Sequence, residues 1–410
     1  MLRVLFMQSQ TYHGSCTVIQ EQLMRYLDRS RVETHVAYNR AGDFEGEMSA
    51  NRSICSIPGV SLRPTSFGPS ILQKKPMQIL SECVKGLDAI PSLAGLARYI
   101  RRRDISIIHG TEKPRDAVYG VLLGKLTGAR SIVHLHVKWN TWLNPGVRWA
   151  LRNADAVVAV SPFVAQSTVG SGIRPERVYT LMNSVVLQDW DDTLDGGPVR
   201  REYGIADTTT VVGILARLFP WKGHVELLRA LALAKERVPD FKLLIVGEPD
   251  PRCTPGRRDF SIDLHELVAE LGLERQVTFT GFRTDVPRVM AALDIFAMPS
   301  YEEPFGVVYL EAMAMRKPVI ALANGGAVYP VRDGETGYLV PVGGIDTMAD
   351  RLVTLMRDPE LRARMGAKGR ERVEQHFTAQ RMSAQAEAIY RQVLNAHCER
   401  AVPVAFLSTE

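Results

Sequence analysis

Two glutamates eight residues apart, Glu303 and Glu311, are the side chains of this sequence best suited to bind a large polar ligand. They lie within residues 299–337, which read PSYEEPFGVVYLEAMAMRKPVIALANGGAVYPVRDGETG. An ionised carboxylate can accept two hydrogen bonds at once, which suits the hydroxyls of sugars. At ~1.5 Å per helical residue the two glutamates would be roughly 12 Å apart. We therefore expect them to bind the two ends of an extended ligand such as a nucleotide diphospho-sugar.

A helix start between these glutamates could bind the charged centre of such a ligand. Apolar residues from Phe305 to Met315 have helical spacing. Pro304 stands where the first helical residue is expected, because proline lacks the N–H that a helix start leaves without a partner. The backbone amides of Phe305, Gly306 and Val307 would then face outward at the positive end of the helix, where anions bind.

Two cations follow the first strand of the second half of the chain. The strand pattern 211–216 leads into Arg217 and Lys222, and a helix pattern follows at 225–235. The carboxyl end of a central strand is where such sheets bind ligands. The planar guanidinium of Arg217 and the compact ammonium of Lys222 could both contact a diphosphate there.

These patterns resemble those of a known enzyme family. Glu303-x7-Glu311, with Pro-Phe-Gly between the glutamates, resembles the E-x7-E motif of retaining glycosyltransferases of family 4, which have the GT-B fold. Arg217-x4-Lys222-Gly matches a second family pattern. The resemblance implies that Glu303 faces the donor sugar and Glu311 the ribose, with the amides between them on the diphosphate.

The same resemblance implies a mechanism without metal or cofactor. Arg217, Lys222 and the amides at 305–307 would stabilise the charge that builds on the leaving diphosphate. Glu303 would orient the sugar. No side chain stands out as a covalent nucleophile, so we expect same-face transfer in which the departing phosphate assists deprotonation of the acceptor.

Further donor contacts are expected at two turns. Gly14 follows the first strand pattern, 1–8, where family members commonly have two glycines, and its backbone is expected near the donor. Gly281 and Phe282 follow the strand pattern 276–280, and in similar enzymes this turn borders the base.

Three histidines lie on two strands of the first half. His109 and His136 end strand patterns, whereas His134 lies two residues before His136 and is expected in the interior. Family 4 enzymes carry a histidine at the end of the second of these strands, near the donor sugar. The resemblance gives that role to His136, with His109 the weaker candidate.

The composition favours a globular enzyme. Of 410 residues 46% are hydrophobic, which is enough for packed cores, and a net charge of +5 suits an anionic substrate without indicating nucleic acid. The five cysteines show no metal-binding spacing, which favours a reducing compartment. No apolar run reaches the ~18 residues of a membrane span. We expect a cytoplasmic protein with at most peripheral membrane contact.

The strand and helix patterns occur in two series, which predicts an α/β protein of the GT-B type. Two doubly wound Rossmann-like domains would face a central cleft. The predicted ranges are an acceptor-side domain at 1–188, a linker at 189–199, a nucleotide-sugar domain at 200–376, a terminal helix packing back on the first domain at 377–400, and a tail at 401–410.

The expected activity is transfer of a sugar, with retention, from a nucleotide diphospho-sugar to a small-molecule acceptor such as a natural product or sugar intermediate. By the family resemblance UDP is the first choice of carrier and GDP the second. An envelope lipid or polysaccharide intermediate is the alternative acceptor. The rival functions are a nucleotide-sugar epimerase or hydrolase, a phosphorylase-like enzyme with a pyridoxal cofactor, and a non-catalytic nucleotide-sugar-binding module. The oligomeric state stays open.

Overall fold

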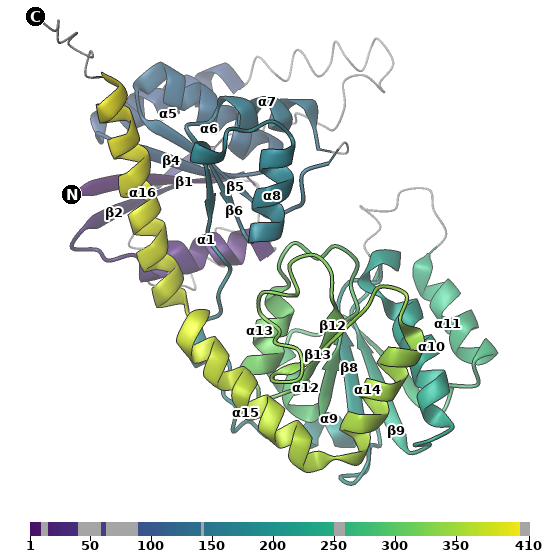
Figure 1. Ribbon diagram of the computed structural model, residues 1–410. Coiled ribbons are helices and arrows are strands. Elements are labelled where there is room, and N and C mark those ends of the chain that lie inside the picture. The colour runs from purple at the N-terminus through teal and green to yellow at the C-terminus, as the bar shows by residue number, and fades with distance from the viewer. Residues whose placement is uncertain (10–14, 40–58, 63–88, 141–142, 250–258, 402–410) are drawn as a thin grey trace, which may run out of the picture. The chain divides into compact units, whose positions relative to one another are not determined.

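The computed structural model describes residues 1–9, 15–39, 59–62, 89–140, 143–249 and 259–401 (Figure 1). The predicted turn residue Gly14 lies outside these ranges. Contacts within the chain divide it into two units. Unit 1 comprises Met1–Asn183 and Ala379–Glu410, and unit 2 comprises Ser184–Thr378.

Unit 1 is a parallel sheet with strand order β3-β2-β1-β4-β5-β6-β7. The order reverses direction between β1 and β4, which is the switch point of a doubly wound sheet. The strands are β1 (Leu2–Gln8), β2 (Val32–Asn39), β3 (Gly59–Leu62), β4 (Ile107–Thr111), β5 (Arg130–Leu135), β6 (Ala156–Ala159) and β7 (Val178–Thr180). The helices are α1 (Ser15–Tyr26), α5 (Ala89–Arg102), α6 (Pro114–Thr127), α7 (Pro145–Asn153), α8 (Pro162–Gly170) and α16 (Ala379–Ala401), with a 3-10 turn, η2 (Pro175–Arg177).

Unit 2 repeats this design with strand order β10-β9-β8-β11-β12-β13, reversing between β8 and β11. The strands are β8 (Thr210–Leu215), β9 (Phe241–Val246), β10 (Val277–Gly281), β11 (Ile295–Ala297), β12 (Val319–Leu322) and β13 (Gly337–Val340). The helices are α9 (Gly197–Glu202), α10 (His224–Lys235), α11 (Phe260–Glu270), α12 (Val286–Ala292), α13 (Val307–Ala314), α14 (Ile345–Arg357) and α15 (Pro359–His376), with 3-10 turns η3 (Leu187–Asp189) and η4 (Pro220–Lys222).

The predicted α/β class with two doubly wound, Rossmann-like domains is confirmed. Central strands such as β1 and β8 are largely buried apolar runs, as expected for parallel sheets covered by helices on both faces. Helices α6, α7 and α8 each carry proline in the first turn, where its missing N–H costs nothing.

The segment 189–199, predicted to be a linker, packs into unit 2. Trp190 is buried, and its carbonyl accepts a 2.9 Å hydrogen bond from Arg370 Nη1. Unit 2 begins at Ser184, before the predicted boundary, and contacts such as the one from Arg370 on α15 attach the segment to it. Sequence composition alone gave no sign of them.

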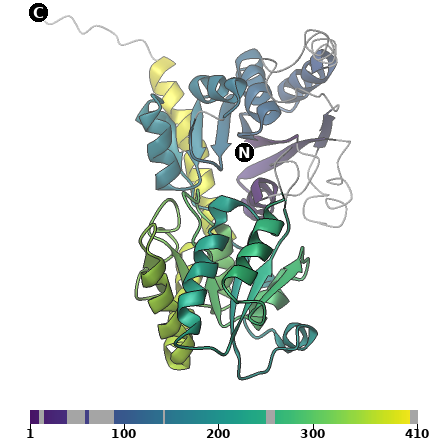
Figure 2. The same cartoon turned by 90° about the vertical axis from the view of Figure 1, so that its right-hand side faces the viewer.

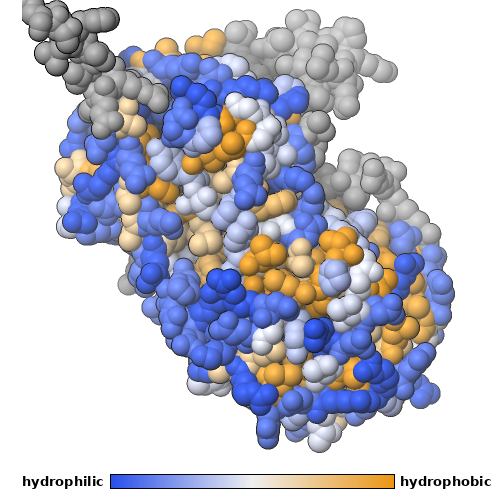
Figure 3. All heavy atoms as spheres, viewed as in Figure 1, coloured by the Kyte–Doolittle hydropathy of each residue, from blue (hydrophilic) through white to orange (hydrophobic). Residues whose placement is uncertain are grey.

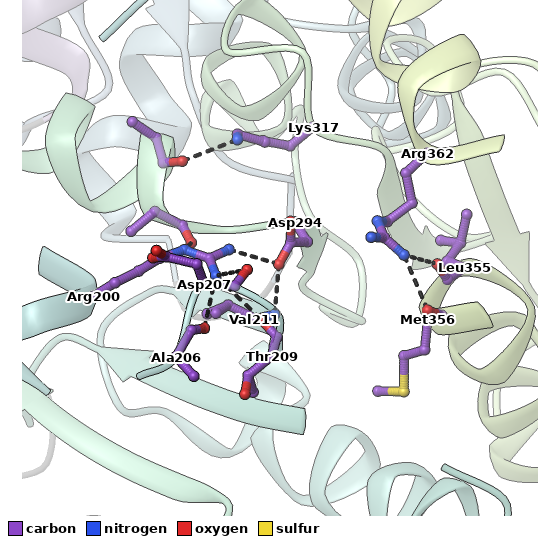
Figure 4. A network of polar contacts seen from close by, with 12 residues as sticks. Arg200, Ala206, Asp207, Thr209, Val211, Asp294, Lys317, Leu355, Met356 and Arg362 are labelled. Atoms are coloured by element: carbon purple, nitrogen blue, oxygen red, sulfur yellow. Dashed lines mark hydrogen bonds and ion pairs between the residues drawn. The ribbon is translucent and has the colours of Figure 1, made fainter. Parts of the chain in front are cut away.

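An arginine at the start of unit 2 fixes the two central strands that carry the site described below (Figure 4). Arg200 on α9 donates through Nη2 to Asp294 Oδ2 at 2.8 Å and through Nη1 to the Thr209 carbonyl at 3.1 Å. The same carboxylate oxygen accepts the amide N–H of Val211 at 2.7 Å. Since Val211 lies in β8 and Asp294 immediately precedes β11, this network holds the amino ends of both strands.

The C-terminal helix α16 packs against α1 in unit 1 (Figures 1 and 2). Tyr390 on α16 is fully buried, and its hydroxyl lies 2.7 Å from Nδ1 of His109. The prediction that His109 ends its strand is wrong, because β4 continues to Thr111 and His109 lies in its middle. The last helix is therefore tied by a buried polar contact to the centre of the first sheet.

The surface in Figure 3 is largely hydrophilic, with hydrophobic residues gathered in a few places that include the loops of unit 2 next to α13. In the described part of the chain, no helix combines the length and the apolar character needed to cross a bilayer.

We predict that Tyr390→Phe destabilises unit 1 by about 1–3 kcal/mol, because it leaves a buried ring nitrogen of His109 without its partner. Urea unfolding measures the change. Tyr179→Phe is the control, since its half-buried hydroxyl has no hydrogen bond to a described residue. An equal effect of the two substitutions would contradict this role of Tyr390.

Candidate functional site

An ion pair joins the loops that follow the two central strands of unit 2. Lys222 Nζ lies 2.6 Å from Glu303 Oε2, and Ser300 Oγ donates to the same oxygen at 3.0 Å. The side chains of Lys222 and Glu303 are only 18% and 13% exposed. The pair lies at the switch point between β8 and β11, where open α/β sheets bind ligands.

Backbone contacts hold these loops together. The carbonyl of Trp221 accepts the amide of Tyr301 at 2.8 Å. The amide of Gly326 donates to the Glu303 carbonyl at 2.6 Å. A Cβ at Gly326 would lie 2.1 Å from the Pro304 carbonyl oxygen, so only glycine allows this approach. The second glycine of the Gly-Gly pair thereby fixes the backbone that aims Glu303.

Helix α13, which follows Glu303 and contains Glu311, starts later than predicted. Pro304 is not its first residue, because α13 runs over Val307–Ala314 with Gly306 as its N-cap at a φ of +84°. This left-handed conformation suits glycine and separates Phe305 from the helix. A Cβ at Gly306 would also lie 2.3 Å from the ring of Tyr309.

The start of α13 is nevertheless open to an anion. No side chain of a described residue caps it. The first amides of a helix have no intrahelical partner, and here they belong to Val307 and Val308. The predicted anion site therefore moves toward Val307, with Phe305 and Gly306 in the approach loop. Glu303 precedes this start and carries a charge that an incoming anion would meet, balanced by Lys222.

Glu311 lies on α13 and is half-buried, and its carboxylate has no hydrogen bond or ion pair to a described residue. Burial raises the pKa of its carboxyl to about 7. A carboxylate held in this state gains most from a ligand that donates hydrogen bonds to it, as a ribose diol does.

The other predicted residues of unit 2 lie at the same edge of its sheet. Arg217 is exposed in the loop that carries Lys222, with its guanidinium 5.1 Å from the centre of the Phe219 ring. Gly281 ends the edge strand β10, and Phe282 beside it is 69% exposed. The structure thus brings Arg217 and Lys222 into one loop. Gly281 and Phe282 also lie at the carboxyl ends of the strands, but at the end of the outermost strand β10.

In unit 1 three histidines form a row, in which His109 and His134 are fully buried and His136 is half-buried. His109 Nε2 lies 3.2 Å from His134 Nδ1, and the ring centres of His134 and His136 are 4.2 Å apart. Burial lowers the pKa of His109 to about 3, so this ring is neutral and belongs to the interior. His134 is interior as expected. His136 lies after the end of β5, at the ligand-binding edge of the sheet.

Sequence reasoning missed Glu112, which follows β4 and is buried beside His136. Its Oε2 accepts the backbone N–H of His136 at 3.2 Å. Burial raises the pKa of Glu112, but the charges of Lys113 and His136 and two backbone N–H groups outweigh it and hold the pKa below its usual value. The position of Glu112 just after a strand pattern could have indicated a residue at the ligand-binding edge. Its contact with His136 could not be predicted in this way, because His136 follows a different strand.

We predict that Glu311→Gln stabilises the protein more at about pH 8 than at about pH 5. Because the folded pKa of about 7 exceeds the usual 4.5, the carboxylate opposes folding, a cost absent below pH 4.5 and complete above pH 7. We expect a gain of about 1–2 kcal/mol at the higher pH, since solvent screens part of the effect at a half-buried group. Urea unfolding at both pH values measures it.

The control for this prediction is Glu270→Gln, which changes an exposed carboxyl on α11. A gain from Glu311→Gln that is independent of pH, or that is matched by Glu270→Gln, would contradict the raised pKa of Glu311.

Comparison with known proteins identifies the family of this chain. Residues 198–372 match the family described as glycosyl transferases group 1, and residues 14–184 match the glycosyl transferase 4-like domain. The chain is 29% identical over 311 residues to N-acetyl-alpha-D-glucosaminyl L-malate synthase of Bacillus anthracis, covering 73% of this chain and 78% of that protein.

Two further similarities extend over most of the chain. The GDP-mannose-dependent monoacylated alpha-(1-6)-phosphatidylinositol monomannoside mannosyltransferase of Corynebacterium glutamicum is 33% identical over 303 residues, which is 69% of this chain and 75% of that protein. The crystal structure of Anabaena HepE with UDP and glucose superposes with a TM-score of 0.75 at 26% identity, covering 95% of this chain and 99% of HepE. The two family matches, the similar enzymes and the paired Rossmann-like sheets show that this chain belongs to family 4 of the glycosyltransferases, within the group 1 glycosyl transferases of the GT-B fold.

Proposed function

We propose that this glycosyltransferase transfers the sugar of a UDP-sugar donor to a small-molecule acceptor with retention of the anomeric configuration. The proposed reaction needs neither a metal nor a cofactor. The observation that carries the proposal is the Lys222–Glu303 pair beside the uncapped start of α13. It places a cation, a sugar-binding carboxylate and open amides in adjoining loops.

In this proposal each part of the donor has its own contacts. The diphosphate lies against Lys222, Arg217 and the first amides of α13, where two cations and a helix start take the place that a metal would have. Glu303 accepts hydrogen bonds from sugar hydroxyls once Lys222 turns to the phosphate. Glu311 binds the ribose diol. Phe282, exposed beside Gly281, borders the base.

Catalysis is then mainly electrostatic. As the bond between the anomeric carbon and the diphosphate oxygen breaks, negative charge grows on that oxygen, and Arg217 and Lys222 stabilise it. The acceptor oxygen bonds to the same face of the anomeric carbon and passes its proton to the departing phosphate. His136 of unit 1 and Gly14 supply the donor contacts expected from that domain.

The choice of UDP rests on a structural relative. Anabaena HepE, at 25–26% identity, was crystallised with UDP, with UDP and glucose, and with UDP-glucose. The Corynebacterium mannosyltransferase is named for GDP-mannose, which keeps GDP as the second choice.

The names of the relatives support two acceptor classes. The Bacillus enzyme is named for L-malate, a small hydroxy acid, and the Corynebacterium enzyme for a phosphatidylinositol mannoside. We favour a small molecule, of which the L-malate in the name of the Bacillus enzyme is an example, and a cytoplasmic site of action. A lipid-linked acceptor is the second candidate.

The rival functions make different products. An epimerase or hydrolase would convert the UDP-sugar without an acceptor, a phosphorylase-like enzyme would need pyridoxal bound to a lysine, and a binding module would bind the donor without turnover. Membership in the glycosyltransferase family favours transfer over all three.

We predict that UDP binds in the presence of EDTA and that Arg217→Ala and Glu311→Ala each weaken it by about 10- to 100-fold, the loss expected for one hydrogen bond to a charged group. Calorimetry with UDP, GDP, ADP and their sugar conjugates measures the affinities. Arg229→Ala, which removes an exposed arginine on α10, is the matched control.

Two outcomes would reject the proposed donor site: affinity for UDP that survives both substitutions, or binding that disappears with EDTA. Nuclear magnetic resonance of the product reports the anomeric configuration, and an inverted product would reject retention.

A further inference from the structure

A thiol, a carboxylate and an imidazole meet at the ligand-binding edge of unit 1. One ligand atom each from Cys16, Glu112 and His136 lies within 4.8 Å of the other two. Cys16 Sγ is 3.6 Å from Glu112 Oε1, and the other oxygen of Glu112 accepts the His136 amide. Cys16 and Glu112 are buried.

The fold places these side chains together from three elements. Cys16 is the second residue of α1, which follows β1, whereas Glu112 and His136 come just after β4 and β5. Strands β1, β4 and β5 are neighbours in the sheet, and β1 and β4 flank its switch point. The cluster therefore has a fixed frame and does not depend on one loop.

The chemistry of this set favours a borderline-soft divalent cation. Zinc binds thiolate, imidazole and carboxylate, and sites with three protein ligands keep a fourth position for water. Ligand atoms around tetrahedral zinc are roughly 3.5 Å apart, so the cluster needs to close by only about 1 Å.

Two further observations point to a cation. Nε2 of His136 is buried and has no hydrogen-bond partner among the described residues. The Glu112 side chain is only 4% exposed, and its carboxylate already has a cation beside it, the ammonium of Lys113. The set thus combines an orphaned imidazole nitrogen with a buried negative charge.

Lys113 is the competing cation. Its Nζ lies 3.2 Å from Glu112 Oε1, on a side chain that is 32% exposed and so can turn away into solvent. Lysine neutralises Glu112 when the metal site is empty, and a metal ion would take over this role.

We propose that Cys16, Glu112 and His136 form a zinc site, and that bound zinc inhibits sugar transfer by holding His136 away from the donor. Binding releases the Cys16 thiol proton and involves no change of oxidation state. The inhibition rests on the proposed function, in which His136 contacts the donor sugar, whereas zinc binding does not.

Zinc binding is tested on the full chain by competition with a chromophoric chelator, followed by metal analysis of the dialysed protein. We expect one zinc per chain. Cys16→Ser and His136→Ala should each weaken zinc binding by more than about 100-fold. This exceeds the loss of about 10- to 100-fold that is usual when a residue hydrogen-bonded to a metal ligand is changed. Cys253→Ser, which changes a cysteine of unit 2, is the control and should have no effect.

Two readouts separate this site from an unrelated one. Lys113→Gln should tighten zinc binding severalfold because it removes the competing charge. Cobalt should give a thiolate-to-metal charge-transfer band that Cys16→Ser abolishes, with the fold of each variant checked by circular dichroism. Less than one zinc per chain at saturation, or binding that is indifferent to Cys16→Ser and His136→Ala, would overturn the site.

The inhibition has its own test. UDP-sugar turnover, measured with EDTA or with a small excess of zinc, should fall with zinc in the wild type and not in Cys16→Ser. Stoichiometric zinc without loss of turnover would overturn the inhibition alone. Absence of turnover under both conditions, with zinc still bound, would count against the proposed transferase activity and leave the metal site standing.

Discussion

The ion pair between Lys222 and Glu303 is the contact on which the candidate site depends. Two mostly buried charges are costly unless each keeps its partner, and truncating one side of a buried pair commonly costs about 3–5 kcal/mol. The backbone contacts of Trp221 and Gly326 hold the loops at the spacing that the pair needs. In the proposed donor complex, phosphate on the lysine and sugar hydroxyls on the glutamate would replace this pairing, so each charge would exchange one partner for another.

The two units place their chemistry at equivalent positions. In unit 2 the loops after β8 and β11 carry Lys222 and Glu303, and in unit 1 the elements after β1, β4 and β5 carry Cys16, Glu112 and His136. Both clusters lie at the switch point of a doubly wound sheet, where helix starts and strand ends face the same way. Unit 2 adds the uncapped α13 and suits an anion, whereas unit 1 gathers a thiol, a carboxylate and an imidazole and suits a cation.

Much of this could be predicted from the sequence because it depends on local pattern. Alternating strand and helix runs predicted both sheets, and the resemblance to family 4 motifs implied that Lys222 and Glu303 belong to one site. The start of α13 was misplaced because Gly306 adopts a left-handed conformation against Tyr309. Glu112 was missed because its neighbours come from strands distant in sequence, and 189–199 looked like a linker because its anchors, such as Arg370, lie far along the chain.

The most direct test of the central claim is a crystal structure of the chain with UDP grown in EDTA. The account predicts diphosphate oxygens within hydrogen-bond distance of Lys222 Nζ and of the Val307 and Val308 amides, with the ribose hydroxyls on Glu311 and the Lys222–Glu303 pair opened. A nucleotide bound elsewhere, or a diphosphate held without these groups while the Lys222–Glu303 pair stays closed, would contradict it.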